Sequence, residues 1–357
     1  MAVSEAAADA LVAPAVRPVG HWTLAWRRLR RDKVAVVSGI FLLVLLFAAF
    51  PGAPLAGKLL GHGPNDLFPY SVNVALRPAG PLTMVPELPT LAGDDLSPTE
   101  HAPPPPGTGK TLFLLGADSQ LGRDEFLRLL YGGRVSLEVA IGAALLALLI
   151  GVVLGSVAGY YGGLADAVVS RFTDLVMAFP VLLLLVLIGS QFDALTHWTL
   201  HGALNQGVLQ LILVIGAFTW FYPARIVRTQ MLSLRQTEFV EAAAMIGARD
   251  RRILRTHLLP HVLPSLIVYG TLLVATNVML EIGVTFLGAG IHLPTSSWGS
   301  MLAQTWGSLL NPNPYNPATT QPWLTIVPSA AIFLTVFSLN QLGEGLREAL
   351  DPRTGLR

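Results

Sequence analysis

One basic segment between two apolar stretches contains the residues whose types and spacing suggest a specific interaction. It reads Glu-Ala-Ala-Ala-Met-Ile-Gly over 241–247 and, after nine further residues, His-Leu-Leu-Pro over 257–260. Alanine lets a helix approach a partner surface closely, and glycine lets the chain bend where that helix ends. Four arginines interspersed with apolar residues follow, so the pattern predicts a short helix, a bend and a second, basic amphipathic turn. Pro260 and Pro264 are expected to end that turn before the next apolar helix begins.

Such a segment is typical of a docking element rather than of a catalytic site. Two kinds of surface are candidates for its partner. One is a protein partner, whose register the charged flanks would fix. The other is anionic lipid, because the arginines alone would support a helix lying in the membrane interface.

Two other motifs resemble metal and nucleotide sites but lack essential parts. The histidine pairs at 197/201 and 257/261 have the spacing of helical zinc ligands, yet no glutamate follows either first histidine and Pro260 interrupts the second pair. The stretch 107–111 reads Gly-Thr-Gly-Lys-Thr, but Pro104 occupies the place where a phosphate-binding loop needs its first glycine. No Ser-His-Asp or paired-carboxylate arrangement stands out, so the sequence predicts no catalytic, cofactor or metal site.

Polar residues inside the apolar stretches are candidates for a translocation path. A charge at the centre of a bilayer costs about 2.5–3.5 kcal/mol on insertion scales, so charged residues inside spans are rare and are candidates for a functional role. Hydrogen bonding between helices, worth about 0.6 kcal/mol per bond, is the alternative and is favoured here. The candidates are Asp174, Asn277, Glu281, Asn340 and Gln341.

The composition of the chain indicates the class of protein in which these residues lie. Of the 357 residues, 52% are hydrophobic and 13% charged, about half the usual share of charged residues in soluble domains. The formal net charge of +1 argues against nucleic acid as a partner. The chain has no cysteine, which excludes disulfides and thiolate chemistry. These values predict an integral membrane protein.

Six stretches are apolar and long enough to cross the roughly 30 Å hydrocarbon core as helices. The first is short and resembles a signal peptide, but its long polar lead, which ends in five basic residues between Arg27 and Lys33, favours a retained anchor. The predicted spans are Val34–Phe50, Val135–Gly159, Val168–Gly189, Gly207–Val227, Ser265–Gly288 and Trp323–Leu342.

The distribution of basic residues predicts the orientation. With both termini in the cytoplasm, 17 of the 23 Lys and Arg lie inside and six lie outside, all between Lys58 and Arg134. Since basic residues resist translocation, both termini are expected inside. The resulting division is a cytoplasmic tail (1–33), helix 1 (34–50), an outside segment (51–134), a transmembrane core (135–342) with a cytoplasmic loop at about 228–264, and a cytoplasmic tail (343–357).

The outside segment is rich in proline: 13 of the 26 prolines lie between Pro51 and Leu115. Because proline interrupts regular helix, we expect irregular or polyproline structure there. A poorly ordered insertion is the simpler interpretation, and a docking surface for an extracytoplasmic partner is the alternative.

The spacing in 241–260 resembles the Glu-Ala-Ala (EAA) loop of permease subunits in ABC importers, in which glycine follows the glutamate by six residues and the proline of Leu-Pro follows the glycine by thirteen. His257 stands where that family commonly has an apolar residue. Further stretches are similar to the peptide/nickel-type permeases, specifically the C partner of oligopeptide and dipeptide importers. They are Leu115–Asp124, in which Ala117 replaces threonine and one residue is inserted, Tyr131–Leu137, Phe286–Gly299 and Leu339–Arg353. The long proline-rich segment departs from the family pattern.

The resemblance implies an all-α integral membrane fold: six transmembrane helices, of which helices 2–6 form a MetI-like permease core and the first is an N-terminal extra helix. It implies a homologous second permease, two ABC ATPase subunits that bind ATP and Mg, an extracytoplasmic substrate-binding protein and a location in the bacterial inner membrane. The residues that would couple this chain to the ATPases are Glu241, Ala242, Ala243, Gly247, Leu259 and Pro260.

The expected function is therefore binding-protein-dependent import of dipeptides or oligopeptides. Import of nickel or another small solute by the same class of permease is the main alternative, because substrate cannot be derived from these residues. A membrane-embedded enzyme using Asp174 or Glu281 is a less favoured hypothesis, since no second catalytic group is apparent. An exporter or assembly-factor subunit is a further one.

Overall fold

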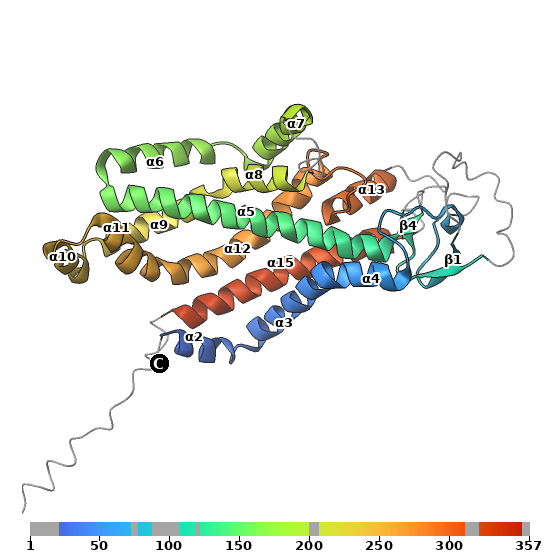
Figure 1. Ribbon diagram of the computed structural model, residues 1–357, viewed down its shortest axis with the longest axis horizontal. Helices are drawn as coiled ribbons and strands as arrows, with labels where there is room; N and C mark the ends of the chain where they lie inside the picture. Colours follow the sequence, from blue (N-terminus) through green and yellow to red (C-terminus); the bar gives the residue numbers. More distant parts are fainter. Residues whose placement is uncertain are drawn as a thin grey trace, which may run out of the picture.

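A computed structural model of the chain describes residues 21–72, 78–87, 108–118, 122–199, 207–310 and 321–351. Long helices run side by side along its longest axis, with α10 at one end and the short strands at the other (Figure 1). The longest are α5 (Glu125–Tyr161), α12 (Leu259–Phe286) and α15 (Trp323–Leu350). The other helices are α2 (His21–Leu29), α3 (Lys33–Phe47), α4 (Ala53–Leu60), α6 (Gly163–Met177), α7 (Val181–Thr199), α8 (Val208–Thr219), α9 (Phe221–Leu234), α10 (Glu238–Met245), α11 (Asp250–Arg252) and α13 (Trp298–Leu310).

Four helical segments are long and apolar enough to cross a membrane: Lys33–Leu60, Glu125–Tyr161, Asp250–Phe286 and Trp323–Leu350. Two bent pairs raise the number to six if each pair is one span. The first pair, α6 with Val181–Gln191 of α7, bends by 86°, and the second, α8 with α9, bends by 42°. Pro180 lies at the first break and Pro223 in the first turn of α9, as expected for prolines that kink helices.

Two predictions that a helix ends at a proline are wrong. The first span was expected to end at Phe50, with irregular structure from Pro51 onward, but a π-helical turn at Ala48–Gly52 carries the helix into α4. Such a turn already interrupts the regular hydrogen-bond ladder, so the missing N–H of Pro51 removes little further hydrogen bonding. In the same way, Pro260 does not end the preceding turn, because the π-helical segment Ile253–Leu258 runs directly into α12. Pro260 is the second residue of α12, directly after this π-helical segment, where the regular hydrogen-bond ladder is already interrupted, so its missing N–H costs little.

The outside segment also has more regular structure than expected. Strand β1 (Thr83–Pro86) pairs antiparallel with β2 (Lys110–Phe113), and β3 (Ala117–Asp118) pairs antiparallel with β4 (Arg123–Asp124). A small apolar cluster of Phe68, Val85, Phe113 and Ala117 lies beneath them. The proline run 103–106 lies outside the described residues.

Helix α5 packs at the centre of the molecule and contacts α8, α9 and α12. Three glycines, Gly151, Gly155 and Gly159, form one face of α5 against α9. A Cβ atom at Gly155 would lie 2.5 Å from the carbonyl oxygen of Ala224, so the two backbones are too close for any larger side chain. Helices α5 and α9 therefore form one tightly packed unit that joins the two ends of the molecule.

Candidate functional site

The predicted docking segment forms a separate lobe at the end of the molecule that carries α10 (Figure 1). Helix α10 begins after Thr237, whose hydroxyl donates to the Leu234 carbonyl at 2.5 Å, and ends at Met245. Gly247 then adopts φ of +83°, with its N–H donating to the Ala244 carbonyl at 2.9 Å. Glycine enters this left-handed region without the steric cost that a side chain brings, which explains its place after the helix.

The two faces of α10 differ in character. Val240 and Ala243 are buried in an apolar cluster that includes Ile253 and Leu258. The opposite face is open: Glu241 and Ala242 are exposed, and the side chains at its tip, Met245 and Ile246, are 82% and 87% exposed. Large apolar side chains beside a carboxylate at the tip of a projecting lobe form a surface suited to a protein partner.

Contacts on its inner side hold the lobe against the long helices. The Tyr160 hydroxyl donates to Asp250 Oδ1 at 3.0 Å, and Arg235 Nη1 donates to the Tyr160 carbonyl at 3.1 Å. The rings of Phe239 and His261 stack with their centroids 5.3 Å apart. The lobe is thereby joined to the end of α5 and to the first turns of α12.

Of the six predicted coupling residues, Glu241, Ala242 and Gly247 share the exposed side of the lobe, and Ala243 lies on its buried side. The other two, Leu259 and Pro260, lie in the first turn of α12, where Leu259 is half-buried and Pro260 exposed. The structure therefore has a helix and a bend at the positions that the spacing predicts. That these residues contact an ATPase remains a prediction.

The five predicted path residues are not brought together. Asp174 forms an exposed ion pair with Arg225, Nη2 to Oδ1 at 3.0 Å, whereas Asn277 and Glu281 are fully buried on α12. Asn277 Nδ2 donates to the Ala140 carbonyl at 3.4 Å, and the Thr285 hydroxyl donates to Glu281 Oε1 at 3.0 Å. Asn340 is exposed and Gln341 half-buried on α15. The contact of Asn277 joins α12 to α5, so for this residue the geometry favours the interhelical interpretation.

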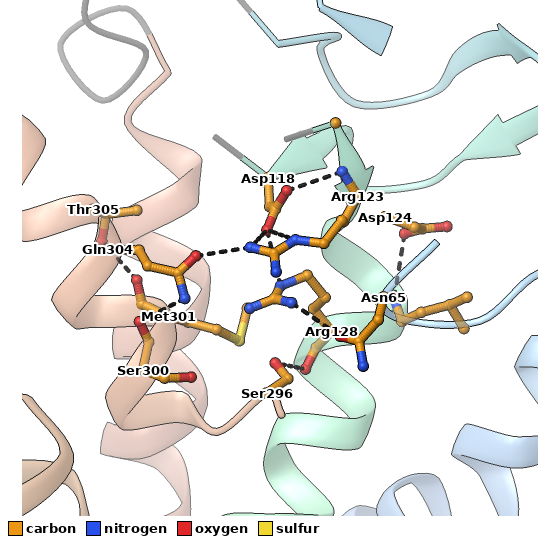
Figure 2. A network of polar contacts seen from close by, with 12 residues as sticks. Asn65, Asp118, Arg123, Asp124, Arg128, Ser296, Ser300, Met301, Gln304 and Thr305 are labelled. Carbon is orange, nitrogen blue, oxygen red and sulfur yellow. Dashed lines mark hydrogen bonds and ion pairs between the residues drawn. The ribbon is translucent and has the colours of Figure 1, made fainter. Parts of the chain in front are cut away.

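Sequence reasoning missed a buried charge cluster at the opposite end, beside the strands (Figure 2). Asp118 Oδ2 lies 2.6 Å from Arg123 Nη2 and 3.0 Å from Arg128 Nε, and Arg123 Nη2 also donates to Gln304 Oε1 at 2.9 Å. The side chains of these three charged residues are no more than 6% exposed. The cluster joins β3, β4, α5 and α13. The motif 115–124 contains its aspartate and one arginine, but charged residues in a sequence do not by themselves reveal burial.

Asp124 extends this cluster to the first spanning segment. Its Oδ1 caps α5 by accepting from the N–H groups of Phe126 at 2.8 Å and Leu127 at 3.3 Å, and its Oδ2 lies 2.9 Å from His62 Nε2. Burial lowers the pKa of His62, but the hydrogen bond to Asp124 and a second one to the Leu60 carbonyl outweigh it, so the pKa lies above its ordinary value.

Among the residues that the structure describes, no group of three or more His, Cys, Asp or Glu side chains could hold a metal ion. His261 Nδ1 instead lies 2.6 Å from the His257 carbonyl oxygen, a local contact within the helix. The side chains of the other histidine pair, 197/201, lie outside the described residues.

Comparison with known proteins decides the class of this molecule. Residues 151–356 match the family model described as the binding-protein-dependent transport system inner membrane component. The chain belongs to this family. Residues 20–76 match a second model, the N-terminal transmembrane domain of oligopeptide transport permease C. This family member is a multi-pass transport permease with an all-α membrane core, as predicted, and the family is a transport component rather than an enzyme.

Individual relatives agree with the family. The chain is 32% identical over 332 residues to the glutathione transport system permease protein GsiD of Pectobacterium atrosepticum, covering 93% of this chain and 91% of that protein. It is 39% identical over 238 residues to the oligopeptide transport system permease protein OppC of Escherichia coli, covering 67% and 72%. A solved chain of the MetNI methionine ABC transporter aligns with a TM-score of 0.46 at 20% identity, covering 61% of this chain and 96% of that chain.

Proposed function

We propose that this permease is one of two homologous subunits that form the translocation path of a peptide importer in the bacterial inner membrane. The relatives named as oligopeptide and glutathione permeases support peptides as the substrate class. Two ABC ATPase subunits would bind ATP and Mg on the cytoplasmic side, and a binding protein would deliver substrate from outside.

The exposed face of α10 is the observation that carries the proposal. Its inner face is buried and its outer face, with Glu241, Met245 and Ile246, projects from one end of the molecule. An ATPase that grips this face would pull on a lobe attached to α5, α9 and α12. Because α5 and α9 pack backbone to backbone, displacement of the lobe is transmitted to the long helices instead of being absorbed locally.

The transport step then requires no chemistry in this chain. Closing of the ATPases on ATP favours one arrangement of the two permeases, and hydrolysis favours the other, so the path opens alternately to either side. This chain contributes a path wall and a docking lobe, while nucleotide binding and hydrolysis belong to the ATPases.

Reversing one charge on the docking face tests the proposal. In proteoliposomes with the complete importer and its binding protein, Glu241→Arg is expected to lower ATP-dependent uptake of labelled peptides about 30-fold or more, because a disrupted charged contact in an interface costs about 2–5 kcal/mol. ATPase subunits should also no longer co-purify with the variant.

Glu348→Arg is the matched control. This exposed glutamate lies near the end of α15, outside the α10 lobe, and its reversal changes the net charge equally. Uptake and co-purification should be unchanged in this control. If Glu241→Arg instead transports and binds ATPases normally, α10 is not the coupling element. Uptake of a different solute by the intact importer would overturn only the peptide assignment.

A further inference from the structure

A groove beside the first spanning segment is not used by the proposed transport mechanism. Its volume is about 1060 Å³, slightly above the roughly 300–1,000 Å³ typical of small-molecule pockets. It is lined by residues of α2, α3, α5, α12 and α15, the elements that run along the long axis of the molecule (Figure 1). These elements belong to one chain, so the groove does not require a second subunit to form it.

The lining is apolar almost throughout. Ile40 and Leu43 of α3 and Leu145 and Leu149 of α5 are each more than half exposed, so they present hydrocarbon surface to whatever fills the groove. The hydroxyl of Thr271, a polar side chain in the lining, is satisfied by donating to the Val268 carbonyl at 2.8 Å. The interior of the groove therefore suits alkyl chains.

The one charged residue of this lining is Arg30, which follows α2. Its guanidinium carbon lies 4.9 Å from the centroid of the Trp26 ring, and it has no carboxylate partner among the described residues. The nearby Asp32 carboxylate caps α3 instead, accepting from the N–H groups of Val34 at 2.9 Å and Ala35 at 3.2 Å. Arg30 thus offers an uncompensated positive charge at one end of an apolar groove.

The place of these residues along the chain sets their depth. The first spanning segment begins at Lys33, so Trp26 and Arg30 lie at the level of the membrane surface. Tryptophan is enriched at that level, and basic residues there attract anionic headgroups. A charged group and an apolar groove meeting at the membrane surface match the two parts of a phospholipid.

We propose that the groove binds one anionic phospholipid, with its acyl chains between α3 and α5 and its phosphate against Arg30. A transmembrane helix of the second permease is the competing occupant. An apolar helix would fill the groove but would offer no counter-charge to the Arg30 guanidinium, whereas the phosphate of an anionic lipid does. The lipid satisfies both features, and the site is independent of how α10 couples to its partner.

Native mass spectrometry of the complete importer, purified with equal amounts of phosphatidylglycerol and phosphatidylethanolamine, tests the site. We expect phosphatidylglycerol to be retained preferentially and Arg30→Gln to lower its retention about fivefold, the effect of one basic residue at an anionic headgroup. Arg27→Gln is the matched control, because Arg27 is an exposed arginine on α2 that does not line the groove. It should leave retention unchanged.

Equal losses in Arg30→Gln and Arg27→Gln, or equal retention of the two lipids, would overturn the proposal. Should Arg30→Gln fail to fold, Gly39→Leu offers a second variant, since it places a side chain in the groove from α3 and should displace the lipid. A photoreactive residue at Ile40 in intact membranes distinguishes the occupants. Crosslinking to phosphatidylglycerol supports the site, whereas crosslinking to the second permease subunit overturns it.

Discussion

The two ends of the molecule differ in the burial and pairing of their charged residues. At the end with the strands, several charged residues are buried and paired within the chain: Asp118 contacts two arginines (Figure 2), and Asp124 contacts His62. At the α10 end, charged and apolar residues are exposed, and the helix has a covered face and an open one. Asp118 and Asp124 thus have their partners within the chain, whereas the exposed face of α10 is the surface that an ATPase would cover in the proposed importer. Substitutions at the first end should therefore affect stability, and those at the second should affect transport.

The largest effect on stability is expected from Asp118→Ala. Removing one partner from a buried ion pair costs about 3–5 kcal/mol, because the remaining charge stays desolvated. Here two arginines would lose their shared carboxylate. Denaturant unfolding of the purified chain in detergent measures the loss. Glu344→Gln is the control: its exposed pair with Arg347, at 3.7 Å, should contribute about 0–1 kcal/mol. Equal losses in both variants would show that the buried cluster of Asp118, Arg123 and Arg128 does not stabilise the fold.

The comparison can be sharpened with two glycines in the same backbone conformation. Gly247 at the α10 end has φ of +83° and Gly61 at the other end +79°, and a Cβ at either position would meet no atom within 4 Å. Alanine at each therefore costs about 1–2 kcal/mol of backbone strain without a clash. Strain of this size shifts a conformational equilibrium by about 5–30-fold.

We expect Gly247→Ala to lower uptake by about this factor, because relief of the strain re-aims α10, and Gly61→Ala to leave uptake unchanged. Thermal unfolding of both variants and the uptake assay separate the two effects. Similar transport in both variants would mean that the bend at Gly247 has no part in coupling.

The same contrast explains which features could be predicted from the sequence. Apolar length revealed the spans, and the spacing of Glu241 and Gly247 located a helix and a bend, because both signals are local. Hydropathy indicates the length of an apolar stretch but not the direction of its helix axis, so it could not reveal the 86° bend between α6 and α7. The apolar stretch that predicts the second span begins at Val135, so the polar start of α5, from Glu125, lies outside the predicted helix. Only contacts between distant segments, such as that of Arg123 with Gln304, make the burial of charged residues there possible.

The smallest expected effect is a pH dependence of stability that arises at the end of the molecule with the strands. The pKa of His62 is raised in the folded protein, because the hydrogen bonds to Asp124 and to the Leu60 carbonyl outweigh the opposing effect of burial. The protonated imidazole is therefore favoured by folding. This stabilisation is fully present below the unfolded pKa of roughly 6.5 and is lost as the pH rises through the folded value.

Thermal unfolding between about pH 5.5 and 8.5 should thus show a midpoint that falls with rising pH, and His62→Gln should flatten that slope without changing uptake at a fixed pH. His261→Gln, which alters an exposed histidine at the α10 end, should keep the slope of the unaltered chain. If His62→Gln retains the full slope, the pairing with Asp124 does not stabilise the end with the strands, and the assignment of stability to this end would rest on Asp118 alone.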